Sequence, residues 1–186
     1  MNIIKGKDYK LENTCVTIGK FDGIHLGHRK LLTEMKKYGD FLNTTVLSFD
    51  NSELNNVLNR GNSMQLCSYE EKISILEEYG VKNLILYPFD TEIRDMLPKE
   101  FIKKVLIEKM DAKIIIAGSN FRFGKNADGN ISTLKYFSDK YNFQIHEVEC
   151  LRNKDRIISS TSIRNLIENG NYKDAGFLLD REIYKK

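Results

Sequence analysis

The stretch Gly19-Lys20-Phe21-Asp22-Gly23-Ile24-His25-Leu26-Gly27-His28 decides the fold and the site. It follows the apolar run Cys15-Val16-Thr17-Ile18, which predicts a β-strand, and it opens a helical pattern from Leu26 to Tyr38. A glycine-rich turn between a strand and a helix lets the backbone approach a ligand closely. His25 and His28 are three residues apart, so we expect them to share one face of the first helical turn.

This turn predicts a phosphate site. Two imidazoles at a helix N-terminus lie beside free N–H groups and the positive end of the helix dipole, which together favour a bound anion. The alternative is a pair of surface histidines beside a tight turn. The chain has only three histidines, and two of them lie here, which favours the phosphate site.

Strands and helices alternate along the rest of the chain. We predict further strands over residues 44–49, 84–87, 114–117 and 143–148, and helices over residues 69–79, 98–106, 134–141, 161–168 and 172–179. This alternation predicts an α/β fold with a doubly wound parallel sheet, in which ligands bind beyond the carboxyl ends of the strands. The polar, asparagine-rich stretch from Asp50 to Gln65 is interpreted as a functional or mobile loop.

Composition excludes several classes of protein. The 186 residues are expected to form one domain, residues 1–186, and 29 basic and 26 acidic side chains are mixed along it. We therefore expect no nucleic-acid partner, since such proteins concentrate basic residues on one face. No apolar run approaches the roughly 20 residues that span a bilayer, so no membrane association is expected. Three cysteines, far apart and odd in number, indicate neither a disulfide framework nor a zinc site and favour a cytoplasmic location.

Two further segments contain chemistry. The run from Ile158 to Arg164 places serine and threonine hydroxyls at a helix start, with an arginine one turn later that could grip pyrophosphate. The alternative is a well-capped helix with a solvated arginine. The run from Gly118 to Gly124 holds Phe121 and Phe123, of which one could pack on the core while the other faces a planar ligand. The alternative is that both pack beneath a loop.

The His-x-Gly-His pattern is a signature of adenylyl- and cytidylyltransferases. Together with the two segments above and Leu97-Pro98-Lys99-Glu100-Phe101-Ile102, it resembles the FMN adenylyltransferase domain of bacterial FAD synthetases over nearly the whole chain. The resemblance implies a Rossmann-like nucleotidyltransferase fold. It also implies that ATP with Mg²⁺ and FMN are converted to FAD and pyrophosphate.

The resemblance assigns roles to individual residues. It implies that ATP is bound by Gly19, Lys20, Phe21, Asp22, His25, Gly27, His28, Asn120, Ser159, Ser160, Thr161 and Arg164. Of these, His25, His28, Asn120 and Arg164 are the catalytic group. Flavin contacts are implied at Phe49, Phe101 and Phe123. The sequence offers no carboxylate cluster, so we expect no protein metal site and a Mg²⁺ held by phosphate oxygens and water.

The sequence departs from the family pattern in two places, and two alternative functions stay open. Residues Asn51-Ser52-Glu53 stand where the family commonly has Pro-His-Pro, and the chain stops about where a riboflavin kinase domain would begin. We expect this chain to make FAD from FMN and not FMN from riboflavin. One alternative is transfer to another phosphorylated acceptor, such as phosphopantetheine, nicotinamide mononucleotide or glycerol 3-phosphate. The other is a non-catalytic flavin- or nucleotide-binding regulator. The sequence indicates no oligomeric state.

Overall fold

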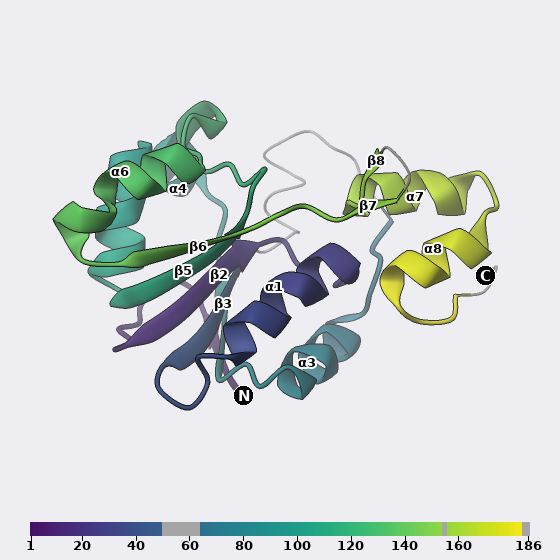
Figure 1. Ribbon diagram of the computed structural model, residues 1–186, viewed down its shortest axis with the longest axis horizontal. Coiled ribbons are helices and arrows are strands. Elements are labelled where there is room, and N and C mark those ends of the chain that lie inside the picture. The colour runs from purple at the N-terminus through teal and green to yellow at the C-terminus, as the bar shows by residue number, and fades with distance from the viewer. Residues whose placement is uncertain (50–63, 154–155, 184–186) are drawn as a thin grey trace.

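A six-stranded parallel sheet forms the centre of the molecule (Figure 1). The computed structural model describes residues 1–49, 64–153 and 156–183. The strands are β1 (Asn2–Lys5), β2 (Thr14–Gly19), β3 (Asn43–Phe49), β4 (Asn83–Tyr87), β5 (Ala112–Gly118) and β6 (Gln144–Val148), in the order β1-β4-β3-β2-β5-β6. All five pairings are parallel. The predicted doubly wound α/β fold is confirmed. The predicted loop at 50–65, with the departure at 51–53, lies almost wholly outside the described residues.

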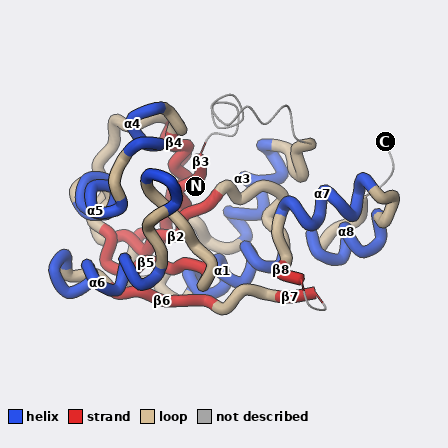
Figure 2. Tube along the Cα trace, turned by 90° about the horizontal axis from the view of Figure 1, so that it is seen from above, coloured by secondary structure: helices blue, strands red, loops and turns tan. Residues whose placement is uncertain are grey.

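Helices cover both faces of the sheet, as Figures 1 and 2 show. One face is covered by α1 (Leu26–Lys36) and α3 (Tyr69–Glu78). The other face is covered by α4 (Thr91–Asp95), α5 (Pro98–Glu100), the π-helix η1 (Phe101–Ile107) and α6 (Ile131–Tyr141). A short 3₁₀ turn, η2 (Lys125–Ala127), follows the loop after β5. The described chain closes with the hairpin β7 (Arg152–Asn153) and β8 (Arg156–Ile157), then α7 (Ser160–Glu168) and α8 (Tyr172–Leu179).

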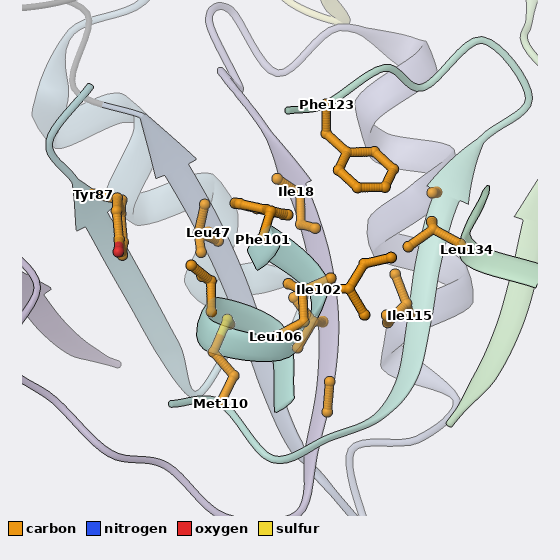
Figure 3. Packing of buried hydrophobic residues seen from close by; sticks show 14 of the residues in the cluster. Ile18, Leu47, Tyr87, Phe101, Ile102, Leu106, Met110, Ile115, Phe123 and Leu134 are labelled. Carbon is orange, nitrogen blue, oxygen red and sulfur yellow. The ribbon is translucent and has the colours of Figure 1, made fainter. Parts of the chain in front are cut away.

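Both faces of the sheet are buried, because successive apolar side chains along a strand point to opposite faces. In β2, Val16 and Ile18 join the cluster beneath η1 and α6, whereas Cys15 joins the cluster beneath α1 and α3. In β5, Ile115 and Ile116 divide in the same way. Runs that are apolar at every position are typical of a parallel sheet covered on both sides. Figure 3 shows the first cluster, with side chains of η1 directed at residues of the strands.

The helix that begins at Pro98 differs from the sequence prediction. Pro98 does occupy the first helical position, but from Phe101 onward the backbone bonds are those of a π-helix. Two of them run from Glu108 N to Lys103 O at 2.9 Å and from Met110 N to Val105 O at 3.2 Å. Phe101, Ile102, Val105, Leu106 and Met110 are all buried and belong to the cluster on this face of the sheet.

The strand order reverses between β2 and β5, and this reversal locates the site. From β2 the chain proceeds outward through β3 and β4, and it returns to the opposite side of β2 for β5 and β6. Connections on the two sides of such a point diverge and leave a crevice at the carboxyl ends of the strands. The Gly19–His28 turn follows β2 at this crevice, as the sequence predicts.

Candidate active site

A cavity of about 470 Å³ opens at the carboxyl ends of β2, β5 and β6. Seven residues that the resemblance assigns to ATP line it, namely Lys20, His25, Gly27, His28, Asn120, Ser159 and Ser160. They come from three separate segments of the sequence, residues 20–28, residue 120 and residues 159–160. The fold thus brings together most of the predicted nucleotide site.

The turn after β2 adopts an unusual backbone. Phe21, Gly23 and Ile24 have φ angles of 48°, 80° and 38°, all in the left-handed region. This region costs a non-glycine residue roughly 1–2 kcal/mol. Phe21 and Ile24 are both 0 % exposed, so burying their side chains offsets that cost. The glycine at position 23 is required for space as well, because a Cβ there would lie 2.8 Å from Leu179 Cδ2 and 2.9 Å from Leu66 Cβ.

The two histidines form a stacked pair at the start of α1. His25 is the N-cap residue, and its Nδ1 accepts a hydrogen bond from the backbone N–H of His28 at 3.4 Å. The imidazole rings stack with centroids 3.9 Å apart, and the ring of Phe21 lies 4.7 Å from that of His28 on the inner side. A neutral His25 that accepts at Nδ1 carries its proton on Nε2. That N–H is then available to a ligand oxygen.

Both imidazoles are held neutral. Burial lowers the pKa of His25 to about 4. Burial, with the nearby His25 and Lys72 as additional causes, lowers the pKa of His28 well below its usual range. Nδ1 of His28 is buried and has no hydrogen-bond partner within the described part of the chain. The pair therefore offers neutral donors at neutral pH, and an anionic ligand would raise both pKa values.

The opposite walls of the cavity supply further polar groups. Ser159 is the N-cap of α7, and its hydroxyl accepts from Ser162 N at 3.1 Å. Ser160 Oγ donates to the backbone carbonyl of Asp22 at 2.9 Å, which joins the start of α7 to the turn after β2. Two helix N-termini, those of α1 and α7, therefore meet at one cavity. This arrangement is suited to an anion such as a polyphosphate.

Phe121 and Phe123 lie in different surroundings, and the one at the cavity is Phe121 rather than the predicted Phe123. Phe123 is 8 % exposed and packs in the core, with its ring 5.5 Å from that of Phe101. Phe121 is half-buried, stacks on Phe123 at 5.4 Å and lines the cavity. Phe101, at 2 % exposure, is a core residue of η1 (Figure 3). The predicted flavin contacts at Phe101 and Phe123 would therefore have to form through rings that already pack against other side chains.

Arg164 does not line the cavity. Its Nη2 pairs with the Asp22 carboxylate, and its Nε donates to the Met64 carbonyl at 2.8 Å. The other Asp22 oxygen, Oδ1, accepts from Leu66 N at 3.0 Å, and Asp22 is 3 % exposed. The two residues join the turn after β2 to the segment that enters α3. In this state the guanidinium predicted to bind pyrophosphate is held by a carboxylate instead.

The other predicted residues lie around the cavity or away from it. Gly19 lies beside the Phe21 ring, where an added Cβ would come within 3.2 Å of Phe21 Cε2. Thr161 is exposed and faces a separate depression behind α7, and Phe49 lines another beside Lys72 and Tyr69. Their assignments to ATP and flavin stay predictions.

One wall of the cavity and one cation beside it were not predicted from the sequence. Residues 148–151, which follow β6, line the cavity, as does the exposed Arg122 on the loop after β5. The rule that ligands bind beyond the carboxyl ends of parallel strands, applied to the strand that ends at Val148, would have indicated this segment. Among the residues that the structure describes, no cluster of three or more histidine, cysteine or acidic side chains could hold a metal ion.

A doubly wound sheet with paired histidines at a strand-to-helix turn defines a nucleotide-binding α/β protein of the nucleotidyltransferase type. Comparison with known proteins makes this more specific, because residues 7–162 match the family model described as FAD synthetase. The chain belongs to the FAD synthetase family. None of the helices within 1–49, 64–153 and 156–183 is long and apolar enough to cross a membrane.

Two curated relatives have names that agree with this family, and one solved structure shares the fold. A bifunctional riboflavin kinase/FMN adenylyltransferase of Buchnera aphidicola subsp. Schizaphis graminum is 38 % identical over 84 % of this chain and 52 % of its own length. The FAD synthetase of Listeria monocytogenes is 31 % identical over 91 % of this chain and 69 % of its own. A crystal structure described as a macrolide-efflux protein from Streptococcus pneumoniae superposes with a TM-score of 0.81 at 28 % identity, covering 97 % of this chain and 62 % of that one. The chain spans about half to three fifths of the bifunctional relatives it matches.

Proposed function

We propose that the protein is an FMN adenylyltransferase that makes FAD. A phosphate oxygen of FMN attacks the α-phosphorus of ATP, the new P–O bond forms, and the bond to the β-phosphate breaks to release pyrophosphate. Family membership supports this reaction, and so do the names of the relatives. The single observation that carries the proposal is the stacked, neutral His25–His28 pair facing the cavity between the starts of α1 and α7.

In this reaction the residues of the chain position charge rather than form covalent bonds. The attacking phosphate is already an anion, so no side chain need act as a nucleophile. The Nε2–H of His25 and the ring of His28 can donate to oxygens of the α-phosphate as negative charge grows there. The N-termini of α7 and α1, which both border the cavity, would bind the β- and γ-phosphates.

The substrate would be ATP complexed with Mg²⁺. Mg²⁺ usually keeps several waters and binds through phosphate oxygens with one or two carboxylates. The one carboxylate that lines the described cavity is that of Glu149, which fits an ion that arrives with the nucleotide. We also propose that the protein acts in the cytoplasm, which its free cysteines Cys15, Cys67 and Cys150 support.

The test is to incubate the purified chain with FMN and MgATP and to identify the products by chromatography and mass spectrometry. We expect FAD and pyrophosphate in equal amounts. His25→Asn, which keeps an N-cap side chain, and His28→Ala should each lower turnover on the order of 10²–10³-fold while the protein stays folded. His146→Ala removes the third histidine, which contacts Glu34 and Tyr38 away from the cavity, and should leave turnover unchanged.

Other outcomes would point elsewhere. Parallel incubations with phosphopantetheine, nicotinamide mononucleotide or glycerol 3-phosphate test the other acceptors, and adenylylation of one of these instead of FMN would replace the proposed substrate. Tight binding of FMN or ATP without any product would mean a non-catalytic binding protein. Near-normal turnover in both folded histidine variants would remove their assigned role.

A further inference from the structure

Lys72 is a buried cation beneath the Gly19–His28 turn, hereafter the histidine turn. It lies on the inner side of α3 and is 8 % exposed. Its Nζ donates to the backbone carbonyl of Lys20 at 3.1 Å and approaches Ser48 Oγ at 3.4 Å. Ser48, fully buried near the end of β3, donates to the same Lys20 carbonyl at 3.0 Å. One backbone oxygen in the turn after β2 thus accepts from two side chains of two other elements.

That carbonyl belongs to the peptide that sets the conformation of Phe21. Phe21 follows directly, has φ of 48° and is 0 % exposed. Its ring packs on His28 at 4.7 Å, and His28 packs on His25 at 3.9 Å. A left-handed residue that is not glycine persists only where its surroundings fix it. A fixed Lys20 carbonyl therefore fixes the Phe21 ring, on which His28 and then His25 stack toward the cavity.

Packing alone does not explain an ammonium group at this position. The N-terminus of α3 is already satisfied by the capping box of Ser68 and Glu71, and Leu76 supplies the fully buried apolar contact. An apolar side chain of similar volume often serves stability as well as a buried charge, or better. The hydrogen bond from the Lys72 ammonium to the Lys20 carbonyl gives this side chain a second role beside packing, because that carbonyl lies in the turn that holds the histidines.

We propose that Lys72 is a positioning residue that, together with Ser48, holds the Lys20 carbonyl and so orients His28 and His25 toward the reacting phosphate. The orienting role is a property of the ligand-free protein, while its catalytic consequence rests on the proposed adenylyl transfer. Lys72 need not touch either substrate. It acts through the Lys20–Phe21 peptide and the Phe21 ring.

The experiment compares Lys72→Met with Lys72→Arg and with a matched control, Lys82→Met. Lys82 also donates to backbone carbonyls, those of Gly39 at 2.6 Å and Leu42 at 3.1 Å, but at the far end of the sheet. Nuclear magnetic resonance of the imidazole groups in the ligand-free proteins reports the surroundings of His28 and His25 without any turnover. We expect Lys72→Met and Ser48→Ala to shift the His28 ring signals and Lys82→Met to leave them unchanged; Ser48→Ala removes a donor to the Lys20 carbonyl without removing a charge, so its shift reports orientation alone.

Kinetics provide the second measurement. With FMN and MgATP, Lys72→Met should lower kcat about 10- to 100-fold and change KM for ATP by less than about threefold, since a misplaced group affects chemistry more than binding. Lys72→Arg should recover part of kcat, and Lys82→Met should match the wild type. If Lys72→Met does not fold, Ser48→Ala removes the other donor and should move the same signals in the same direction.

Two results would overturn the proposal. One is a folded Lys72→Met or Ser48→Ala protein whose His28 and His25 signals match those of the wild type. The other is a loss of kcat that Lys82→Met reproduces. If neither the wild type nor any variant makes FAD while Lys72→Met and Ser48→Ala both shift the imidazole signals, the positioning role stands and the proposed function fails.

Discussion

At the scale of single residues, His25 combines two tasks that proteins usually divide. As the N-cap of α1 it satisfies a backbone N–H, a task that serine, threonine, aspartate or asparagine usually performs. As a neutral imidazole it presents the opposite ring nitrogen to the cavity. The cap fixes which nitrogen carries the proton, so the start of the helix and the chemistry of the site depend on one hydrogen bond.

This double role predicts how stability depends on pH. The pKa of His25 is about 4 in the folded protein and about 6.5 in the unfolded chain, so between these values the unfolded chain binds more protons. The free energy of unfolding that His25 contributes is fully present above about pH 6.5 and is lost as the pH falls toward about 4. At pH 5 the loss from His25 is about 2 kcal/mol.

Urea unfolding at pH 7.5 and pH 5 measures this loss. His25→Asn keeps a capping side chain and removes the titrating ring, so the stability of this variant should fall about 2 kcal/mol less between the two pH values. If the free energy of unfolding changes by the same amount between the two pH values in the variant and the wild type, the imidazole is solvated in the folded protein.

A second residue-scale prediction concerns Thr17, in the middle of β2. Its hydroxyl is buried at 0 % exposure and has no hydrogen-bond partner within the described residues. Thr17→Val should raise the free energy of unfolding by about 1 kcal/mol, because it removes a desolvated polar group and keeps the branched shape. Thr14→Val is the matched control on the same strand.

The control should behave in the opposite way. Thr14 is also 0 % exposed, but its hydroxyl donates to the Met110 carbonyl at 2.6 Å. Removing this hydrogen bond in Thr14→Val should lower the free energy of unfolding by about 1–2 kcal/mol. Thermal and urea unfolding of the two variants decide the matter, and a destabilised Thr17→Val would mean that its hydroxyl has a partner in solution, such as a buried water.

At the scale of elements, Asp22 and Arg164 connect three segments that the sequence separates widely. The turn after β2, residues 64–66 before α3, and the first turns of α7 meet at this ion pair and its hydrogen bonds. Arg164 is 142 positions from Asp22, so no local pattern predicts the pair. The arginine seen here supports the fold, and its predicted grip on pyrophosphate would require it to leave or share the carboxylate.

The pair predicts a strong coupling between two substitutions. Arg164→Lys keeps the charge but cannot donate to both Asp22 and the Met64 carbonyl, so it should lower the free energy of unfolding by about 1–3 kcal/mol. Asp22→Asn should also destabilise the protein. The double variant should cost less than the sum of the two by about 0.5–3 kcal/mol.

Urea unfolding of the three proteins measures the coupling, and strictly additive losses would contradict the pair. Calorimetric titration with MgATP adds the functional reading. A loss of ATP affinity in Arg164→Lys that Asp22→Asn does not share would support direct contact with the triphosphate.

At the scale of the whole molecule, the C-terminal helices dock against the histidine turn. A third hydrophobic cluster, made of Leu66, Ile158, Ile163, Ala175, Leu178 and Leu179, fills the space between α7, α8 and residues 64–67. Gly23 is where this cluster touches the turn. Figure 1 shows α7 and α8 beside the sheet rather than on one of its faces, so this junction helps set the position of α7 relative to the turn after β2.

Gly23→Ala tests the junction. The φ angle of 80° opposes any side chain, and the added Cβ would meet Leu179 and Leu66 below 3.0 Å. Gly170→Ala is the matched control, since its φ is 75° and no atom lies within 4 Å of its Cβ position. The free energy of unfolding should fall by about 1 kcal/mol in both variants through backbone strain. In Gly23→Ala it should fall by about a further 1–3 kcal/mol through overpacking.

Thermal unfolding of both variants, with amide hydrogen exchange in α7 and α8, provides the measurement. We expect faster exchange in both helices for Gly23→Ala only. Equal losses in the two variants would show that the C-terminal helices can move away from the turn at no cost.

How much the sequence predicts depends on whether a feature is local. The strands at 44–49 and 114–117 and the capping box of Ser68 follow from short patterns, and the structure confirms these elements. The histidines, Asn120 and Ser160 line one cavity, at the end of the sheet that the rule for parallel strands indicates. The edge strand β1 was missed, since its four residues are mostly exposed and show no alternation. The winding of η1 and the direction of Arg164 depend on distant packing partners.

The place of β1 at the edge of the sheet has a consequence for synthesis on the ribosome. Asn2–Lys5 leaves the ribosome well before its hydrogen-bonding partners, residues 83–86, which follow about 80 residues later. At roughly 5–20 residues per second, β1 waits about 4–16 s for the strand it joins. Its brevity, and the lysines at positions 5 and 7, limit the pairing that an unmatched strand could make with a neighbouring nascent chain in the meantime.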